Sequence, residues 1–292
     1  MLDSPKTLPR VRFRQIVDAD VNDVVDLLTR GFAPRRTRAF WQEAMARLAA
    51  HETPGAPRYG YLLDDGSRPV GVVLLVSCLV PAGGGMRVRS NVSSWYVDPA
   101  FRSYASVLIS HAIRHKEVIY VNLTSVAHTR PILLAQGYSC YAKGVFSAAL
   151  PLHILARAPR TRIVPADATL RGSFAPYERQ VLLDHASYGC AAFWCETDER
   201  AYPFVFRLRS LKGIPCAQLV YCREVADCVR FIGPIARYLT LRGRLLLLID
   251  ANGPIPGLIG KYFDQIMPRY FRGPDRPRLG DLAYTEIAML GV

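Results

Sequence analysis

The sequence predicts an α/β fold in two related domains, and three observations support this. The chain has 292 residues, half of them apolar, which is long for one compact domain and comfortable for two. Residues 11–150 alternate strand-like and helix-like patterns in the order β α α β β β α β α β β. Part of that order recurs after a proline-rich segment. We therefore expect a first domain at 1–150, a linker at 151–165 and a second domain at 166–292.

Hydrophobic periodicity and turn residues define the elements of the first half. Asp20 is a residue type that caps helices, and apolar residues behind it form one helical face. Asp65-Gly66 predicts a hairpin turn, and Gly137 predicts the end of a short helix. The expected strands are 11–17, 58–63, 69–80, 88–97 and 118–123, with one or two more in 138–150. The expected helices are 20–31, 37–50, 104–116 and 128–136.

The second half is predicted in the same way. Leu211-Lys212-Gly213 predicts a hairpin turn, and Gly243 ends the last long helix. The expected strands are 161–164, 202–209, 214–223, 245–250 and a last one at 283–290, and the expected helices are 176–188 and 225–241. This order echoes the first half without a close residue-level repeat, which indicates two domains that have diverged.

The charge of the chain is strongly basic, with a formal net charge of +13. Such a charge favours acidic ligands in general. However, no run of Lys or Arg is longer than two residues, and aromatic residues do not interleave with a basic stripe. We therefore expect an anionic ligand such as a coenzyme phosphate and no dedicated binding of nucleic acid. Salt-dependent retention on DNA would be needed to support the nucleic-acid alternative.

Cysteine usage and hydropathy indicate a cytoplasmic protein. The seven cysteines form no CxxC pair and no zinc-type grouping with histidine, so we expect reduced thiols and no metal. His111 and His115 have metal-compatible helical spacing, but a solvated helix face is the favoured interpretation. The N-terminus lacks a secretory apolar region, and the apolar runs 70–80 and 245–249 are too short to span a bilayer. We expect no membrane association.

The most informative segment is 94–138, which is predicted to run from a strand through a tight basic loop into a helix and then a second strand. Arg102 and Ser103 precede the helix directly. Backbone N–H groups and the helix dipole both favour anions at a helix N-terminus. A strand-to-helix site of this kind usually serves a nucleotide or a coenzyme.

The residues of this segment resemble a known family. They are Trp95-Tyr96-Val97-Asp98-Pro99-Ala100-Phe101-Arg102-Ser103-Tyr104-Ala105-Ser106, the strand 118–123 and the Gly137-Tyr138 pair. The run resembles the GCN5-related N-acetyltransferase (GNAT) superfamily over roughly the first half of the chain. The resemblance implies two tandem domains, each with a mixed, mostly antiparallel central sheet flanked by helices, the second being a degenerate copy. It also implies acetyl-CoA or another acyl-CoA as cosubstrate and no metal.

The resemblance further implies which residues bind the cosubstrate. Arg102 and the N–H groups of the loop would hold the pyrophosphate, and the strand that ends at Val97 would pair with the pantetheine arm. The implied cofactor-binding residues are Tyr96, Val97, Arg102, Ser103, Tyr104, Ala105, Ser106, Val107 and Asn122. Two of them depart from the family pattern, since Ala105 and Val107 stand where the family has small residues, mostly glycine. A tyrosine that protonates the leaving thiolate in many members is replaced here by Leu133.

The expected strand 88–97 contains no glutamate that would act as a base. The candidates are therefore other polar side chains near the strand ends: Ser94, Asn122, Thr124, Ser125, His128 and Tyr138. Of these, His128, Ser94 and Tyr138 are the expected catalytic residues. His128 is a candidate because the ordinary pKa of histidine lies near neutrality. The alternative, which is favoured, is that His128 only caps a short helix or lies on its surface.

The second half has no comparable loop. Glu224 and Asp227 occupy the equivalent position and would repel a pyrophosphate, so we expect no coenzyme there. The turn 250–254 either faces a cleft or is an ordinary turn, the second being favoured.

The resemblance implies an acyltransferase that moves an acyl group, most simply acetyl, to an amine of a small molecule or a protein by direct attack. The alternative is a catalytically weak or inactive CoA-binding or regulatory module. A homodimer is left open.

Overall fold

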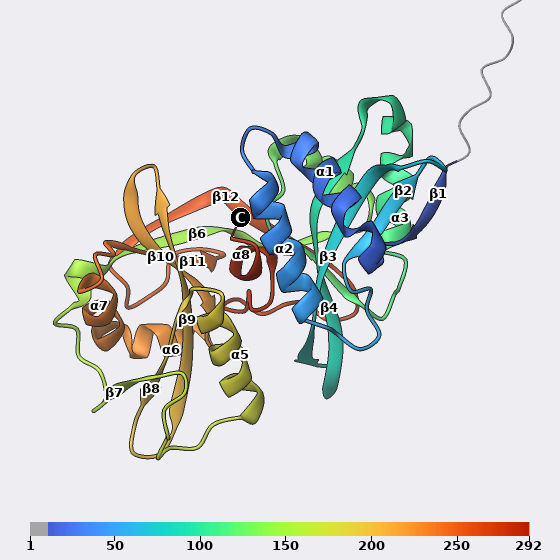
Figure 1. Ribbon diagram of the computed structural model, residues 1–292. Helices are drawn as coiled ribbons and strands as arrows, with labels where there is room; N and C mark the ends of the chain where they lie inside the picture. Colours follow the sequence, from blue (N-terminus) through green and yellow to red (C-terminus); the bar gives the residue numbers. More distant parts are fainter. Residues whose placement is uncertain (1–10, 292) are drawn as a thin grey trace, which may run out of the picture. The chain divides into compact units, whose positions relative to one another are not determined.

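The computed structural model describes residues 11–291, apart from the side chain of His128 (Figure 1). The chain divides into two compact units. The first ends at Val121 and includes Gly273–Asp275, and the second holds the remaining residues from Asn122 onward. This division falls near residue 121, whereas the expected domain boundary lies at 150. The reason is that β6 (Ser139–Ala149), expected to close the first domain, pairs with β11 and β12 of the second unit.

The first unit has a mixed, mostly antiparallel sheet with the strand order β1-β2-β3-β4-β5. Neighbouring strands are antiparallel except β4 and β5, which are parallel. The strands are β1 Arg12–Gln15, β2 Gly60–Asp64, β3 Pro69–Ala82, β4 Gly85–Val97 and β5 Ile119–Asn122. The helices are α1 Val21–Phe32, α2 Arg38–Ala50 and α3 Ala105–Ala112, with the short 3₁₀ turns η1 Asp18–Asp20 and η2 Pro99–Tyr104.

The core of the first unit forms where helices cover β3 (Figure 1). The first ten residues of β3 are all buried, which fits a strand covered on both faces. Helix α1 is amphipathic, and its buried face consists of Val24, Val25, Leu27 and Leu28, each completely shielded from solvent. Burying four such side chains contributes roughly 6–12 kcal/mol relative to leaving them exposed. The helix and its apolar face are as the sequence predicts.

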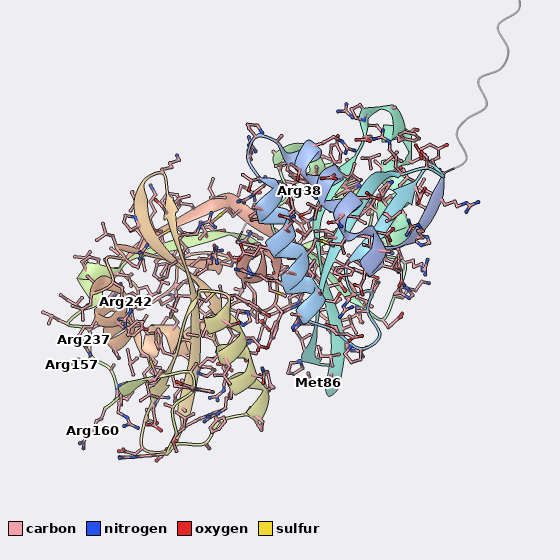
Figure 2. All side chains as sticks on the ribbon, viewed as in Figure 1. Arg38, Met86, Arg157, Arg160, Arg237 and Arg242 are labelled. Carbon is pink, nitrogen blue, oxygen red and sulfur yellow. The ribbon has the colours of Figure 1, made fainter. Side chains whose placement is uncertain are left out.

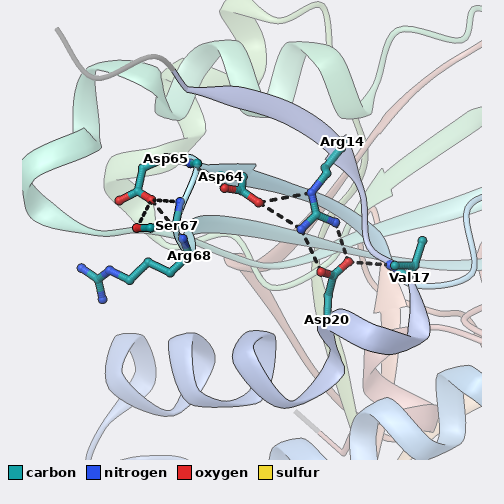
Figure 3. A network of polar contacts seen from close by, with 8 residues as sticks. Arg14, Val17, Asp20, Asp64, Asp65, Ser67 and Arg68 are labelled. Carbon is teal, nitrogen blue, oxygen red and sulfur yellow. Dashed lines mark hydrogen bonds and ion pairs between the residues drawn. The ribbon is translucent and has the colours of Figure 1, made fainter. Parts of the chain in front are cut away.

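Asp20 does not cap α1 through its side chain, which corrects the expected role. Its carboxylate instead accepts two hydrogen bonds from Arg14, at 2.6 and 2.8 Å, and one from the N–H of Val17 at 2.9 Å (Figure 3). Arg14 also donates to Asp64 at 3.0 Å, so one guanidinium joins β1 to β2 and to the start of α1. The hydrogen bonds from Arg14 lower the pKa of Asp20, and partial burial opposes them.

The β2–β3 hairpin has the turn that Asp65-Gly66 predicts. Gly66 has φ of +98°, a value that glycine adopts without strain. The carboxylate of Asp65 accepts hydrogen bonds from the backbone N–H groups of Ser67 and Arg68, at 2.9 and 3.0 Å, and from the Ser67 hydroxyl (Figure 3). The turn is thus closed by its own side chains.

The second unit has the strand order β12-β6-β11-β10-β9-β8-β7, in which only β10 and β11 form a parallel pair. Its core is rich in aromatic residues, including the mutually packed Phe193, Phe204, Phe206 and Phe231. The further strands are β7 Arg162–Pro165, β8 Ala191–Glu196, β9 Ala201–Leu211, β10 Ile214–Tyr221, β11 Leu246–Ala251 and β12 Gly260–Arg272. The helical elements are η3 Ala127–Thr129, α4 Arg130–Ala135, η4 Leu150–His153, α5 Pro176–Ser187, α6 Val225–Arg230, α7 Ile232–Thr240 and α8 Glu286–Met289.

Two expectations for the second half are wrong. The last strand expected at 283–290 is a loop followed by the short helix α8, whose residues are buried on every side, so their apolar run does not distinguish strand from helix. The helix expected at 225–241 is divided at Phe231 into α6 and α7.

The segment expected as a linker, 151–165, also makes a tertiary contact. His153 is buried, and its ring nitrogen accepts the N–H of Ile259 at 3.0 Å.

The internal repetition that the sequence suggests is visible in the strand pairing. In the first unit Arg89–Asn91 pair in parallel with Ile119–Val121, and in the second unit Cys216–Gln218 pair in parallel with Leu246–Leu248. Ile119 lies 30 residues after Arg89, and Leu246 lies 30 residues after Cys216. A β-bulge follows in β4 and in β10. Each unit therefore contains one parallel strand pair followed by a bulge in its first strand, and this arrangement is called the fork below.

None of the helices in the described part of the chain is long and apolar enough to cross a membrane.

Candidate functional site

The candidate site is the place where β4 and β5 separate. The parallel pairing between them ends at Asn91 and Val121. Beyond this point β4 continues through Val92–Val97, and among the strand pairs of the described residues this stretch pairs with β3 alone. One edge of β4 is therefore left without a strand partner over six residues, and an edge of this kind offers backbone N–H and C=O groups to an extended ligand.

A buried amide holds the two strands at the point where they diverge. Asn91 is 1% exposed, and its side-chain nitrogen donates to the carbonyl of Val92 at 3.2 Å and to that of Val121 at 3.3 Å. A side chain thus bridges the two strands where direct pairing stops. Sequence reasoning missed Asn91, although a polar residue inside a strand of largely buried side chains is a signal that could have found it.

Ser94, one of the predicted catalytic residues, lies in a bulge of β4. Ser93 pairs with Leu74 and Tyr96 pairs with Val72, so Ser94 and Trp95 together oppose a single residue of β3. Ser94 has φ of +50°, in the left-handed region that non-glycine residues rarely adopt. A bulge of this kind redirects the local N–H groups and side chains. Because no glycine marks it, the sequence does not reveal it.

Tyr96 and Val97 follow the bulge. The phenol of Tyr96 donates to the carboxylate of Asp98 at 3.2 Å. Burial, reinforced by the nearby Asp98 charge, raises the pKa of Tyr96, so the phenol keeps its proton at neutral pH. Its ring is held against Gly31 of α1, where an added Cβ would lie only 2.4 Å from the ring carbon Cγ.

The backbone of Val97 faces the open edge of β4. The N–H of Asp98 donates to the carbonyl of Val70 in β3 at 2.8 Å. Successive N–H groups of a strand alternate in direction, so the N–H of Val97 points away from β3. The side chain of Val97 is buried, which leaves its backbone as the part available for contact.

The predicted phosphate loop is a helix instead of an open loop. Residues 99–104 form the 3₁₀ turn η2, which leads directly into α3. The N–H of Ala105 already donates to the carbonyl of Arg102, so this one N–H of the expected Ser103–Val107 cradle is not available to a phosphate. The cause is local, since Asp98 and Pro99 provide a start for helical geometry.

The side chains of this segment retain the features that anion binding requires. Arg102 is exposed and lies close enough to Tyr96 for its charge to act on that phenol. Ser103, Ser106 and Val107 are exposed, whereas Tyr104 and Ala105 are half-buried. The N-terminus of α3 adds a partial positive charge beside Arg102.

The remaining predicted residues belong to the second unit. Asn122 ends β5, and its side-chain oxygen is buried without a hydrogen-bond partner among the described residues. Tyr138 is buried, and its backbone N–H donates to the carbonyl of Leu133 at 3.0 Å. His128 lies in the turn Ala127–Thr129, and its side chain is outside the described part of the structure.

The equivalent position of the second unit differs in its charge pairing. Arg223 donates two hydrogen bonds to the buried carboxylate of Glu178, both at 2.5 Å, so its charge is already matched by a partner. Burial and the neighbouring Glu224 raise the pKa of Asp227. Carboxylates at this position would oppose a phosphate ligand.

The turn after β11 has structural partners. Asp250 pairs with Arg269 at 2.9 Å, and Asn252 accepts the N–H of Lys143 at 2.8 Å while it donates to the carbonyl of Tyr141 at 3.0 Å. The turn also lines a cavity of about 330 Å³ together with Val225 and Leu279. Among residues 11–291, no group of three or more His, Cys, Asp or Glu side chains has an arrangement that could hold a metal ion.

Comparison with known proteins gives a clear result for the fold and none for the sequence. No protein-family model matches the chain, and no curated protein matches it. Solved structures do match over most of its length. A protein of Pyrococcus horikoshii assigned as an acetyltransferase is 11% identical, with 97% of this chain and 96% of that chain covered and a TM-score of 0.54.

Two further structures are similar to a comparable degree. A GCN5-related N-acetyltransferase from Kribbella flavida is 12% identical over 90% of this chain and 70% of its own, with a TM-score of 0.59. Another from Anabaena variabilis is 12% identical over 90% and 72%, with a TM-score of 0.56. With a mixed, mostly antiparallel sheet flanked by helices in each unit, the chain therefore has the fold of the GCN5-related N-acetyltransferases.

Proposed function

We propose that the chain is an acyl-CoA-dependent N-acyltransferase, which moves an acyl group, most simply acetyl, to an amine. The observation that carries this proposal is the open edge of β4 at Val92–Val97, with the bulge at Ser94 inside it and Arg102 just beyond it. An extended edge followed by a cationic helix N-terminus suits a ligand that is a peptide-like arm at one end and a pyrophosphate at the other. Acyl-CoA has that chemistry.

The residues present fit such a ligand in most respects. The backbone of Tyr96 and Val97 would pair with the amides of the pantetheine arm, and Asn122 at the end of β5 has a buried oxygen that needs a donor. Arg102, with Ser103, Tyr104, Ser106 and Val107 along η2 and α3, would hold the phosphates. Ala105 would contribute only van der Waals contact, because its N–H already donates to the carbonyl of Arg102.

Rate enhancement would come from position and from electrostatics. Holding acceptor amine and thioester together removes the entropy of a bimolecular encounter, which is worth about 7–11 kcal/mol in favourable cases. An N–H redirected by the bulge at Ser94 would polarise the thioester carbonyl in the manner of an oxyanion hole. Direct attack by the amine then requires no covalent enzyme intermediate.

Proton transfer is assigned to the polar residues that the sequence proposes as catalytic. We propose that His128 takes the proton of the attacking amine, because its ordinary pKa suits that task. Ser94 and Tyr138 are the proposed donors to the departing thiolate, since Leu133 stands where many members of the family have a tyrosine.

A second function is favoured by one specific observation. Leu133, which stands where many members of the family have a tyrosine, is buried and apolar, so it cannot protonate a departing thiolate. This would weaken turnover more than binding, so a CoA-binding module with little or no catalysis is the alternative.

An assay of free thiol release from acetyl-CoA tests the proposal. The full chain is incubated with acetyl-CoA and a panel of primary amines, and thiol release is followed with and without each amine. Amine-dependent release that falls in Ser94→Ala and His128→Ala supports acyl transfer. Saturable binding of acetyl-CoA without release by any amine supports the binding module and removes the enzyme assignment.

A further inference from the structure

A cavity in the second unit has a lining that suits an acidic group. We infer that it binds the carboxylate or phosphate group of the acceptor, so that the acceptor is an amine that also carries an anionic group. The acceptor part of this inference rests on the proposed function, whereas the anion site itself does not.

The cavity has a volume of about 270 Å³ and lies at the carboxyl end of β5. Its polar lining consists of two hydroxyl residues and three arginines: Thr124, Ser125, Arg130, Arg209 and Arg269. They come from the segment after β5, the start of α4, β9 and β12, so distant parts of the unit converge here. None of the residues that line it carries a carboxylate.

The charges around the cavity do not cancel. Arg269 is 2% exposed and is matched by Asp250, with two hydrogen bonds at 2.9 and 3.1 Å. Glu286 does not line the cavity, and its carboxylate accepts the Thr124 hydroxyl at 2.8 Å. Arg130 and Arg209 form no ion pair in the described part of the chain, and Arg209 donates instead to the neutral side chain of Gln218 at 2.9 Å. Two unmatched arginines against one carboxylate leave an excess of positive charge.

Two donor groups of the lining lack partners. The side-chain oxygen of Ser125 and the Nε of Arg130 are buried, and neither has a hydrogen-bond partner among residues 11–291. Buried polar atoms are nearly always satisfied in proteins, because an unsatisfied one destabilises the folded state. A carboxylate or phosphate supplies the acceptor oxygens that a hydroxyl and a guanidinium both require.

The wall of the cavity also contains strained backbone. In β12 the pairing with β6 is interrupted between Asp264 and Arg269. Within this bulge Gln265 and Met267 have φ of +57° and +51°, and Met267 lines the cavity. Non-glycine residues held in this region of backbone conformation are strained, and such residues cluster at ligand sites. The bulge places Met267 and Arg269 together on one wall.

The positive charge of the lining favours the acidic group of the acceptor over its amine. An ammonium group would meet Arg130 and Arg209 with no carboxylate in the lining, so the cavity disfavours the reactive amine itself. The volume is small for a whole ligand, which usually occupies about 300–1,000 Å³. The cavity therefore suits one acidic substituent of a larger acceptor.

Binding of inorganic phosphate tests the anion site without any turnover. Isothermal titration in a low-salt buffer compares the full-length wild type with Arg130→Gln and Arg209→Gln, and with Arg242→Gln as a matched control. Arg242 is exposed after α7, where its guanidinium packs on Tyr238, and it does not line the cavity (Figure 2). We expect each cavity variant to weaken phosphate binding about tenfold, the loss typical of one charge-assisted hydrogen bond, and the control to match the wild type.

Equal phosphate affinity in all four proteins, or no binding by the wild type, overturns the site. Ser125→Ala removes a donor without changing charge and provides a second test if an arginine variant fails to fold, as judged by circular dichroism. A smaller loss of affinity in Ser125→Ala than in the arginine variants is expected.

The acceptor assignment has its own test. Matched amines that differ only in the acid, such as β-alanine with β-alanine amide and phosphoethanolamine with ethanolamine, are compared in the thiol-release assay. Preference for the acidic member that falls about tenfold in Arg130→Gln supports the assignment. Turnover of both members without preference overturns it and leaves the proposed function intact. Absence of any turnover, with phosphate binding as expected, overturns the acceptor assignment and the proposed function while the anion site stands.

The coenzyme itself carries a phosphate that could enter the cavity. The affinities for CoA and for dephospho-CoA, which lacks the 3′-phosphate, separate this source from the acceptor. The same ratio in wild type and Arg130→Gln supports the acceptor assignment. Loss of that ratio in Arg130→Gln overturns it in favour of the coenzyme phosphate.

Discussion

The side-chain amide of Asn91 donates to the carbonyl oxygen of Val121 at 3.3 Å, where β4 and β5 stop pairing. The same nitrogen donates to the carbonyl of Val92, so one buried group ties both strands at the fork. Whatever binds along the open edge of β4 depends on this junction.

Replacing Asn91 with leucine removes the bridge and leaves buried carbonyls without a donor. We expect Asn91→Leu to lower the free energy of unfolding by about 1–3 kcal/mol, measured by urea denaturation. Asn22→Leu, at an exposed position of α1, is the matched control and should change stability by less than about 0.5 kcal/mol. Equal stability of Asn91→Leu and the wild type would show that the bridge is not needed.

Gly31 and Tyr96 are expected to be coupled. Alanine is usually favoured over glycine inside a helix by about 1 kcal/mol, but a Cβ at Gly31 would overlap the Tyr96 ring. Gly31→Ala should therefore destabilise the protein by about 1–3 kcal/mol. In a Tyr96→Ala background the same change should be neutral or stabilising. A double-mutant cycle in urea measures the coupling, and simple additivity of the two changes would contradict the contact.

The Arg14–Asp20 pair predicts a pH dependence. The pKa of Asp20 is lowered in the folded state, so its contribution to stability is complete above the unfolded pKa of about 3.9 and disappears as the pH falls through the lowered folded value. Asp20→Asn should cost about 1 kcal/mol at pH 7, a value discounted for solvent screening, and the cost should shrink towards pH 2.

Denaturation between pH 2 and 7 measures this difference, with Asp23→Asn on the exposed side of α1 as the control. A difference between wild type and Asp20→Asn that stays constant over this range would rule out the proposed linkage.

The buried pair Arg269–Asp250 sets the wall of the second-unit cavity. Asp250→Ala leaves a buried guanidinium without its counter-charge and should cost about 3–5 kcal/mol. The double variant Arg269→Met with Asp250→Leu should recover most of that loss, because no charge remains buried. Asp26→Ala removes the exposed partner of Arg38 and should cost less than about 1 kcal/mol. A double variant as unstable as Asp250→Ala would contradict this explanation.

The sequence predicts those parts of the fold that depend on local patterns. The buried face of α1, the Asp65-Gly66 turn and the position of β4 follow from periodicity and turn chemistry. β12 could not be predicted in this way, because six of its first seven residues are exposed and a bulge interrupts its alternation. The assignment of β6 to the second unit depends on pairing with strands about a hundred or more residues later.

The site is predictable to a similar extent. The position of Arg102 before a helix is evident from the sequence, whereas the 3₁₀ turn that occupies the Ala105 N–H is not, since it depends on how residues 99–104 settle against β4. The bulge at Ser94 arises from a register shift between two strands, which no single position reveals. The convergence of Arg130, Arg209 and Arg269 is a tertiary feature without a sequence motif.

Equilibrium binding of acetyl-CoA tests the central claim most directly. Isothermal titration compares the wild type with Arg102→Glu and with Arg12→Glu, a matched charge reversal on the exposed residue Arg12 of β1. The proposed site predicts saturable binding by the wild type and by Arg12→Glu, with affinity reduced about tenfold or more in Arg102→Glu. No binding by the wild type at millimolar acetyl-CoA, or equal binding by all three proteins, would contradict an acyl-CoA site at the open edge of β4.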